Sequence, residues 1–156
     1  MSNKEVLESF YTAFQKGDAQ AMASLYHPDG YFSDPVFQAL TADEAGSMWT
    51  MLLERSKGNL TIDFHSIEES DDSISCTWEA KYLFSKTERP VHNIIQTKMT
   101  IEDEKIIIHE DTFNFWKWSR MALGTPGLLL GWTPFLKKKV RTQAQTSLQN
   151  FIYKES

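Results

Sequence analysis

The chain has 156 residues, of which 41% are hydrophobic, 13% aromatic and 24% charged. This length suits one domain that buries its own core, and the apolar fraction is too high for a disordered chain. No run of about 20 uncharged apolar residues is present, and the polar first ten residues lack the pattern of a secretory signal peptide. A single cysteine, Cys76, excludes an internal disulfide and a multi-cysteine metal cluster, which favours a reducing, cytoplasmic compartment.

Charge is distributed unevenly along the sequence. Residues 1–116 carry 9 Lys and Arg against 20 Asp and Glu, whereas residues 117–156 carry 7 Lys and Arg against one Glu. The two parts have net charges of −11 and +6, and the whole chain has −5, which argues against nucleic acid as a partner. We expect the basic tail to dock on its own domain or on a second subunit, ahead of an anionic ligand or surface.

The N-terminal region has helical periodicity. Apolar residues three or four positions apart predict a helix over residues 4–16, with Ser2 or Asn3 as its N-cap. Gly17 supplies a stop that tolerates positive φ, and Asp18 can cap a short second helix.

The next segment contains turn signals and a further helix. Residues 27–30, with the sequence HPDG, predict a turn that ends the second helix. Residues 31–37 predict a short strand that a proline interrupts, which implies an edge or a bulge. Thr41 and Glu44 have the spacing of a capping box and predict a third helix over residues 42–55.

From residue 60 the apolar pattern alternates with a period of two residues. It predicts four long strands joined by three hairpin-like connections, and therefore an antiparallel sheet with one buried face. The helices before the meander indicate an α+β fold with helices packed on that face. The residues expected to point inward are Leu60, Ile62 and Phe64; Ile74, Cys76, Trp78, Ala80, Tyr82 and Phe84; Val91, Asn93, Ile95, Thr97, Met99 and Ile101; and Ile107, His109, Asp111, Phe113 and Phe115.

The last forty residues have a different character. Residues 121–135 predict an apolar loop that contains proline, glycine and Trp132, and an amphipathic basic helix is expected to follow. We expect this extension to pack on the outside of the domain or across a dimer; a lid over a pocket comes second and contact with a membrane third.

Residues 3–116 resemble the nuclear transport factor 2-like superfamily, in its group of SnoaL-like polyketide cyclases and ketosteroid isomerases. The closest stretch is FYTAFQKGDAQAMASLYHPDGYFSDPVF, residues 10–37. The resemblance implies a cone-shaped, cystatin-like domain over residues 1–116, with residues 117–156 as an extension. It also implies an apolar pocket for a small molecule between the sheet and the first helix, and a homodimer. We expect no cofactor, and although Asp34, His109 and Asp111 could bind a metal ion, no metal-binding spacing supports such a site. The superfamily also includes binders and scaffolds.

Asp34 is the first candidate catalytic residue. Its place before Pro-Val is similar to that of the general base of ketosteroid isomerases, and burial among hydrophobic neighbours would raise its pKa. The alternative is that Asp34 only caps a turn.

His109 and Asp111 are the second candidates, because positions i and i+2 of a strand share a face. SnoaL-like cyclases are similar in their use of a carboxylate from the sheet, so Asp111 could act as base with His109 orienting the substrate. The alternative is a hydrogen-bonded pair that only stabilises the sheet.

The chain departs from the isomerase pattern at both oxyanion donors. The tyrosine position falls on Phe10, with Tyr11 on a different face of the helix, and the acid position falls near Thr97. Steroid isomerisation by that mechanism is therefore not expected.

Three functions remain open on the sequence. They are a cofactor-independent isomerase, cyclase or dehydratase acting on an apolar carbonyl compound, a non-catalytic binder of an apolar metabolite, and a dimeric interaction module. The expected substrate-binding residues are Phe10, Phe14, Trp49, Trp78, Tyr82, Asn93, Thr97 and Phe113.

Overall fold

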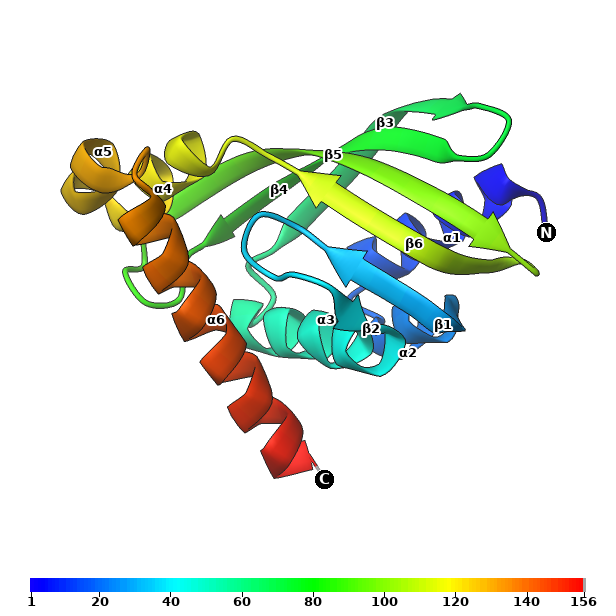
Figure 1. Ribbon diagram of the computed structural model, residues 1–156, viewed down its shortest axis with the longest axis horizontal. Helices are drawn as coiled ribbons and strands as arrows, with labels where there is room; N and C mark the ends of the chain where they lie inside the picture. Colours follow the sequence, from blue (N-terminus) through cyan, green and yellow to red (C-terminus); the bar gives the residue numbers. More distant parts are fainter. Residues whose placement is uncertain (156) are drawn as a thin grey trace.

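The computed structural model describes residues 1–155 and shows an α+β fold in which helices pack on a curved six-stranded sheet (Figure 1). Three N-terminal helices lie on one side of the sheet, and two short helices lie beyond the end of the last strand. A long C-terminal helix runs back past them alongside α3 (Figure 1).

The N-terminal helices begin at the predicted caps. In α1 (Asn3–Gln15), Ser2 and Glu5 form a capping box; in α2 (Ala19–Ser24), the Asp18 side chain accepts from Ala21 N. In α3 (Ala42–Ser56), Thr41 and Glu44 form the predicted capping box. Because each such cap is worth about 1 kcal/mol, the local sequence fixes where these helices start.

The sheet has the strand order β2-β1-β6-β5-β4-β3. The pairs β3–β4, β4–β5 and β5–β6 are antiparallel, as predicted. The strands are β1 (Tyr26–Ser33), β2 (Leu40–Thr41), β3 (Thr61–Glu69), β4 (Ile74–Leu83), β5 (Pro90–Glu102) and β6 (Lys105–Thr112).

The first strand differs from the prediction in its bounds and its direction. Residues 27–30 do not form a turn but belong to β1, which pairs with β6 in parallel. The register of this pair shifts between Tyr26 and Tyr31, so Pro28 lies in an irregular segment that needs no ladder donor. The strand ends at Ser33, residues 34–37 form a bend, and the short β2 was not predicted.

The predicted alternation of buried and exposed side chains is confirmed on β5, but on β6 it is displaced and the strand ends earlier than expected. Val91, Asn93, Ile95, Thr97 and Met99 are all buried on one face of β5. A register shift in the β5–β6 pair displaces the pattern at the start of β6, where Ile106 rather than Ile107 is fully buried. The strand stops at Thr112, so the predicted strand residues Phe113 and Phe115 lie in the exit from the sheet and in the next helix.

The C-terminal extension is helical almost throughout. The segment predicted as an apolar loop contains α4 (Phe115–Leu123) and α5 (Thr125–Leu130), and α6 (Pro134–Glu155) follows. Helix α6 packs against α3, where Leu148 is fully buried in the main core. None of the helices in the described part of the chain has the length and apolar character needed to span a bilayer.

Close packing of α5 on α4 depends on Gly127. A Cβ atom at this position would lie 1.9 Å from the Ser119 carbonyl oxygen. We expect Gly127→Ala to lower the free energy of unfolding by about 1–3 kcal/mol, because the helices must move apart. Urea unfolding followed by tryptophan fluorescence measures this. Leu128→Ala, at an exposed neighbour, is the control and should change stability by no more than about 0.5 kcal/mol. Unchanged stability of Gly127→Ala would show that the contact is looser than described.

Candidate active site

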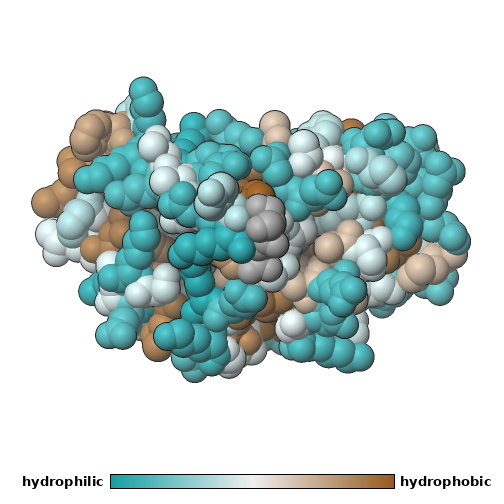
Figure 2. Space-filling view, turned by 90° about the horizontal axis from the view of Figure 1, so that it is seen from below, coloured by the Kyte–Doolittle hydropathy of each residue, from teal (hydrophilic) through white to brown (hydrophobic). Residues whose placement is uncertain are grey.

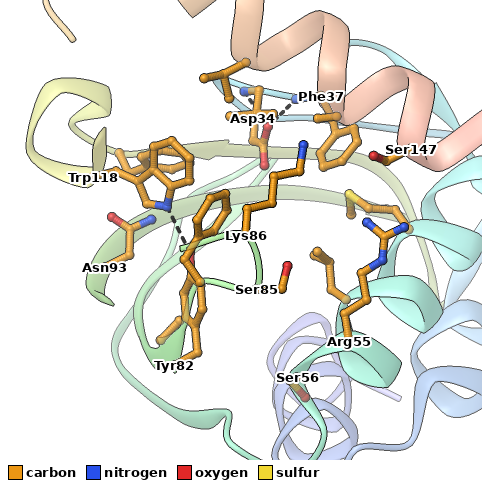
Figure 3. A pocket seen from close by; sticks show the side chains of 18 of the residues that line it. Asp34, Phe37, Arg55, Ser56, Tyr82, Ser85, Lys86, Asn93, Trp118 and Ser147 are labelled. Atoms are coloured by element: carbon orange, nitrogen blue, oxygen red, sulfur yellow. Dashed lines mark hydrogen bonds between the residues drawn. The ribbon is translucent and has the colours of Figure 1, made fainter. Parts of the chain in front are cut away.

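A cavity of about 530 Å³ opens between the buried face of the sheet and helices α3, α4 and α6 (Figure 3). Its volume is that of a site for a small organic molecule. Most of the wall is apolar, and polar side chains from several elements interrupt it. The apolar and aromatic residues of the wall include Phe14, Val36, Phe37, Met48, Trp49, Met51, Trp78, Ala80, Ile95, Phe113 and Trp118.

Asp111 projects from β6 into this cavity and is held by hydrogen bonds from two neighbours. Thr97 Oγ1 on β5 donates to Asp111 Oδ1 at 2.6 Å, and His109 Nε2 lies 3.1 Å from the same oxygen. Asp111 is only 4% exposed and His109 is fully buried. Both groups that fix the carboxylate therefore act through Oδ1, and this arrangement leaves Oδ2 available to a ligand.

Further hydrogen bonds extend from Asp111 in both directions. Tyr11 O–H on α1 lies 2.8 Å from Thr97 Oγ1, and Tyr26 O–H on β1 lies 2.8 Å from His109 Nδ1. Trp49 Nε1 on α3 donates to the Tyr26 oxygen at 2.9 Å.

One arrangement of protons satisfies every donor in this network. Trp49 donates to Tyr26, Tyr26 to His109 Nδ1, and neutral His109 donates from Nε2 to Asp111. On the other side Tyr11 donates to Thr97, which donates to Asp111. Both chains of donors end on one carboxylate oxygen, so the network stabilises a negative charge on Asp111. Burial is the first cause that raises the pKa of both tyrosines, which keeps them protonated as donors.

Asp34 lies in the bend after β1 and also lines the cavity. Its Oδ1 accepts hydrogen bonds from the backbone N–H groups of Val36, at 2.7 Å, and Phe37, at 2.6 Å. Burial raises the pKa of Asp34 to about 7, the nearby charge of Asp111 adds to this, and the two backbone donors and Arg141 oppose it. The turn-capping role and the desolvated carboxyl group considered on the sequence therefore coexist in one residue.

Tyr82 supplies a hydroxyl group to the same cavity. Its oxygen accepts from Trp118 Nε1 at 2.9 Å (Figure 3), which leaves its own proton free for donation to a ligand. Burial, as the largest cause, raises the pKa of Tyr82. Trp78, on the same strand β4, has a buried Nε1 with no partner among residues 1–155. An unpaired buried donor is unfavourable, so an acceptor on a ligand that reached it would be favoured.

Three cations lie where the cavity opens to solvent. Arg55 comes from α3 and Lys86 from the β4–β5 connection (Figure 3), and Lys139 comes from α6. All three are exposed residues that line the cavity. None of them takes part in an ion pair within the described part of the chain. The polar interior thus carries carboxyl groups, and the opening carries positive charge.

The structure separates the predicted site residues into two layers. Asp34, Asp111 and the predicted binding residues Phe14, Trp49, Trp78, Tyr82, Asn93 and Phe113 line the cavity. Phe10, Thr97 and His109 are buried but lie outside the lining. For these three the expectation of direct substrate contact is not supported, because each packs behind a residue that faces the cavity. Thr97 and His109 instead hold Asp111.

Tyr11 and Tyr26 belong to the site and were not selected from the sequence. Tyr11 was placed on a different helix face from Phe10, yet both rings are fully buried and contact one another edge to face at 5.1 Å. Tyr26 directly precedes the HPDG segment and was hidden by its interpretation as a turn. A buried tyrosine near a predicted polar strand face was the available signal.

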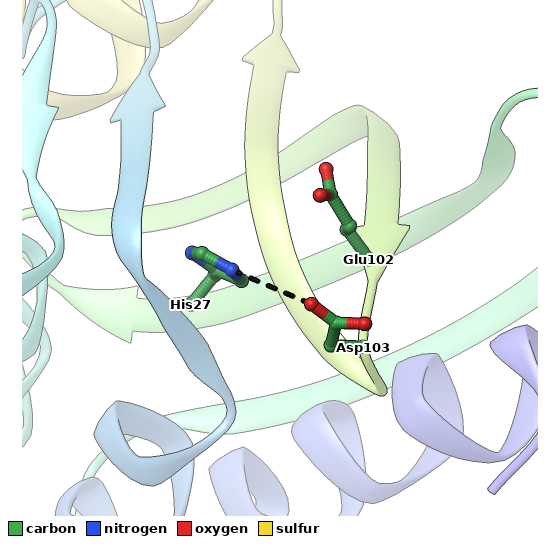
Figure 4. A group of neighbouring side chains, drawn as sticks. All are labelled: His27, Glu102 and Asp103. Carbon is green, nitrogen blue, oxygen red and sulfur yellow. Dashed lines mark ion pairs between the residues drawn. The ribbon is translucent and has the colours of Figure 1, made fainter.

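The single cysteine and the other three histidines do not line the cavity. Cys76 is buried, as predicted, and burial raises the pKa of its thiol to about 12, which makes it a poor nucleophile. His65 and His92 both contact Glu79 on the outer face of the sheet. At the exposed turn between β5 and β6, His27 Nε2 lies 4.0 Å from Asp103 Oδ2, with Glu102 nearby (Figure 4). This cluster links β1 to the turn.

The chain belongs to the SnoaL-like domain family, whose sequence model matches residues 7–109. The resemblance proposed on residues 3–116 is thereby confirmed. Among curated proteins no match is found.

Solved structures show that the fold is that of the NTF2-like proteins. IdmH of Streptomyces antibioticus, a proposed polyketide cyclase, aligns with a TM-score of 0.66 and 15% identity over 78% of this chain and 98% of that chain. An NTF2-like protein of unknown function from Cytophaga hutchinsonii aligns with a TM-score of 0.61 and 9% identity, over 73% of this chain and 91% of that chain. An LEH-like epoxide hydrolase of M. tuberculosis aligns with a TM-score of 0.60 and 16% identity, over 80% of this chain and 90% of that chain.

The raised pKa of Asp34 predicts a pH-dependent cost to stability. The folded state binds the Asp34 proton up to about pH 7, whereas the unfolded chain releases it near its ordinary value of 3.8. The unfavourable contribution of Asp34 therefore grows from about pH 4 to about pH 7 and then stays constant.

Asp34→Asn keeps an Oδ1 acceptor for the bend and removes the charge. We expect it to raise the free energy of unfolding by about 1–2 kcal/mol at pH 8 and to leave it unchanged near pH 4. Urea titrations at a series of pH values measure this. As a control, Asp63→Asn changes an exposed carboxylate, and its free energy of unfolding should differ from that of the unchanged protein by the same amount at every pH. An equal effect of Asp34→Asn on the free energy of unfolding at pH 4 and at pH 8 would contradict the raised pKa of Asp34.

Proposed function

We propose that the protein is a cofactor-independent isomerase, cyclase or dehydratase that moves a proton at the carbon next to a carbonyl group. The observation that carries the proposal is the placement of two carboxyl groups, Asp34 and Asp111, in one apolar cavity with different hydrogen-bond environments. Pairs of titratable groups in contrasting environments are typical of general acid–base sites.

Asp111 is the proposed base. Two hydrogen-bond chains stabilise its charge through Oδ1, so Oδ2 is free to take the proton from the α-carbon of the substrate. His109 is a positioning residue here, because its neutral Nε2–H tautomer holds the carboxylate and Tyr26 holds that tautomer.

Asp34 and Tyr82 are the proposed groups that act on the carbonyl oxygen. Asp34 has a pKa of about 7 and therefore retains its proton up to near neutrality. It can donate that proton as the α-carbon loses its own, which gives a neutral enol, while the free Tyr82 hydroxyl donates a hydrogen bond.

Atoms and charges then balance without a cofactor. In an isomerisation, Asp111 returns its proton to a different carbon and the enol oxygen gives its proton back to Asp34. In a cyclisation, the enol carbon bonds to a second carbonyl carbon of the same molecule. The electron pair of that carbonyl moves to its oxygen, which takes the proton from Asp111, while the enol oxygen returns its proton to Asp34 and becomes a carbonyl group again. Family membership supports this class of reaction, and the volume and aromatic wall of the cavity suit a flat apolar substrate.

One observation favours the alternative of a non-catalytic binder of an apolar metabolite. The resemblance to ketosteroid isomerases puts their second oxyanion donor near Thr97, and Thr97 is engaged with Tyr11 and Asp111. In this alternative the network only stabilises the cavity wall, and the same pocket binds a ligand without chemical change.

The first prediction of the proposed function concerns proton exchange in an enolisable ketone. We expect the protein to accelerate incorporation of deuterium at the α-carbons of 2-tetralone in D2O, measured by proton NMR. Asp111→Asn should lower this rate by about 100-fold or more, because its amide cannot accept the proton. Asp34→Asn should lower it by about tenfold, and Asp63→Asn, at an exposed carboxylate, should not change it.

Binding measured in parallel separates the two functions. Tryptophan fluorescence titration with 2-tetralone should give the same Kd for Asp111→Asn and the unchanged protein within about threefold, because apolar contacts dominate. Binding without acceleration of exchange by the unchanged protein would favour the binder and reject the catalytic proposal.

The cations at the opening predict the kind of polar group that the substrate carries. We expect 2-naphthoic acid to bind more tightly than its methyl ester, because Arg55 and Lys86 can contact a carboxylate at the opening. The double substitution Arg55→Ala with Lys86→Ala should weaken the acid about five- to tenfold and the ester less than twofold. Lys81→Ala with Lys98→Ala, on exposed sheet residues, is the matched control. Equal losses for acid and ester would contradict an anionic substrate group.

A further inference from the structure

Beyond the pocket, the clearest unexplained surface lies at the end of the molecule that carries α5. Five large hydrophobic side chains gather there within eight residues, and we call them the apolar tip. Figure 2 shows hydrophobic residues at this end of the molecule. The members and their exposed fractions are Leu128 (49%), Leu129 (63%), Leu130 (43%), Trp132 (72%) and Phe135 (69%).

The apolar tip is exposed while the segments on either side of it are packed. Trp118 and Ala122 of α4 are buried, and so are Gly127 and Leu136. The extension is therefore docked on its own domain through α4 and α6, as expected, but docking leaves the tip uncovered. Contiguous exposed apolar side chains of this kind mark a surface that meets a partner or a membrane.

Basic residues lie beside the apolar tip. We define the cationic rim as Lys117, Arg120, Arg89, Lys137 and Lys138, which lie on α4, before β5 and on α6. No acidic residue occurs between Asp111 and Glu155, so no carboxylate of the extension neutralises this surface. Among the described ion pairs none includes a member of the cationic rim.

A shallow hollow beside the tip brings part of the rim together. Arg89, Lys117 and Arg120 line it with Leu128. The Arg120 guanidinium lies 4.4 Å from the Trp116 ring centroid, and its Nε is buried with no hydrogen-bond partner among residues 1–155. Three cations and an unpaired donor next to exposed leucine are complementary to a phosphate group joined to hydrocarbon.

We propose that the apolar tip and the cationic rim form a docking surface for the anionic face of a lipid bilayer. Leucine, tryptophan and phenylalanine side chains enter the boundary between head groups and acyl chains, and the rim contacts lipid phosphates. The sequence alone placed membrane contact behind packing and a lid, because it could not show which apolar residues remain exposed.

Two features favour a bilayer over a second copy of the chain. Symmetric pairing of two tips would bring two cationic rims against each other, and like charges oppose such pairing. The tip also lies next to the pocket, whose lining includes Pro126 of α5 and Leu136 of α6, the two helices that carry tip residues. An apolar ligand that partitions into the bilayer would thus meet the protein close to the opening.

The test is sedimentation of the full chain with vesicles, and it needs no knowledge of the substrate. Vesicles of phosphatidylcholine alone are compared with vesicles that contain about 30 mol% phosphatidylglycerol. We expect the protein to sediment with the anionic vesicles, to remain largely in solution with the neutral ones, and to be released by salt.

Paired variants separate the contributions of the tip and the rim. Leu129→Ser with Trp132→Ser, and separately Lys117→Glu with Lys138→Glu, should each lower the partition constant at least about tenfold. The matched controls are Tyr31→Ser with Ile94→Ser and Lys81→Glu with Lys98→Glu, which change exposed sheet residues and should remain within twofold. Leu129→Ser alone, at a side chain that is 63% exposed, serves if the double variant does not fold.

Three results would overturn the proposal. The first is an unchanged protein that stays in solution with both kinds of vesicle. The second is a Leu129→Ser, Trp132→Ser variant that binds like the unchanged protein. The third is a dimer in sedimentation velocity without lipid that these substitutions convert to a monomer, because the tip is then occupied by a second copy. Loss of proton exchange activity leaves vesicle binding unaffected, so the two proposals fail separately.

Discussion

Satisfying the buried carboxylate of Asp111 is the constraint on which the interior of this protein depends. A carboxylate at this depth needs hydrogen-bond donors that offset its burial. The network of donors that ends on its Oδ1 comes from α1, β1, α3, β5 and β6, because Tyr11, Tyr26, Trp49, Thr97 and His109 each contribute one link. The same bonds that make Asp111 usable also fix how the helices lie on the sheet, so site and core are one structure.

The two carboxyl groups of the cavity show how neighbouring acids acquire different roles. Asp111 is surrounded by side-chain donors, whereas Asp34 is held by two backbone N–H groups in a bend where burial outweighs them and raises its pKa to about 7. A carboxylate stabilised by donors and a carboxyl group that retains its proton near neutrality form a complementary pair. This contrast arises from environment, since the two residues are chemically identical.

The C-terminal extension forms part of the cavity wall and packs on the rest of the domain. Helix α6 supplies Leu136, Val140 and Ala144 to the wall of the cavity, and Arg141 Nε donates to the Pro35 carbonyl oxygen at 2.8 Å. Thr87 Oγ1 likewise donates to the Ala122 carbonyl oxygen, joining the β4–β5 connection to α4. The extension therefore contacts the Asp34 bend through α6 and the β4–β5 connection through α4.

The sequence by itself determined the helix starts, the alternation of the long strands and the α+β class, because caps and periodicity are local properties. It also selected His109 and Asp111, since polar residues on an apolar strand face are conspicuous, and it selected Asp34 through the resemblance of its place before Pro-Val to that of a general base. Only the tertiary structure decided that β1 runs parallel to β6, that Tyr11 and Tyr26 complete the network, and that Thr97 and His109 stand behind the cavity wall. These features depend on register, on bulges and on which element lies opposite, and such long-range pairings leave no periodic trace in the chain.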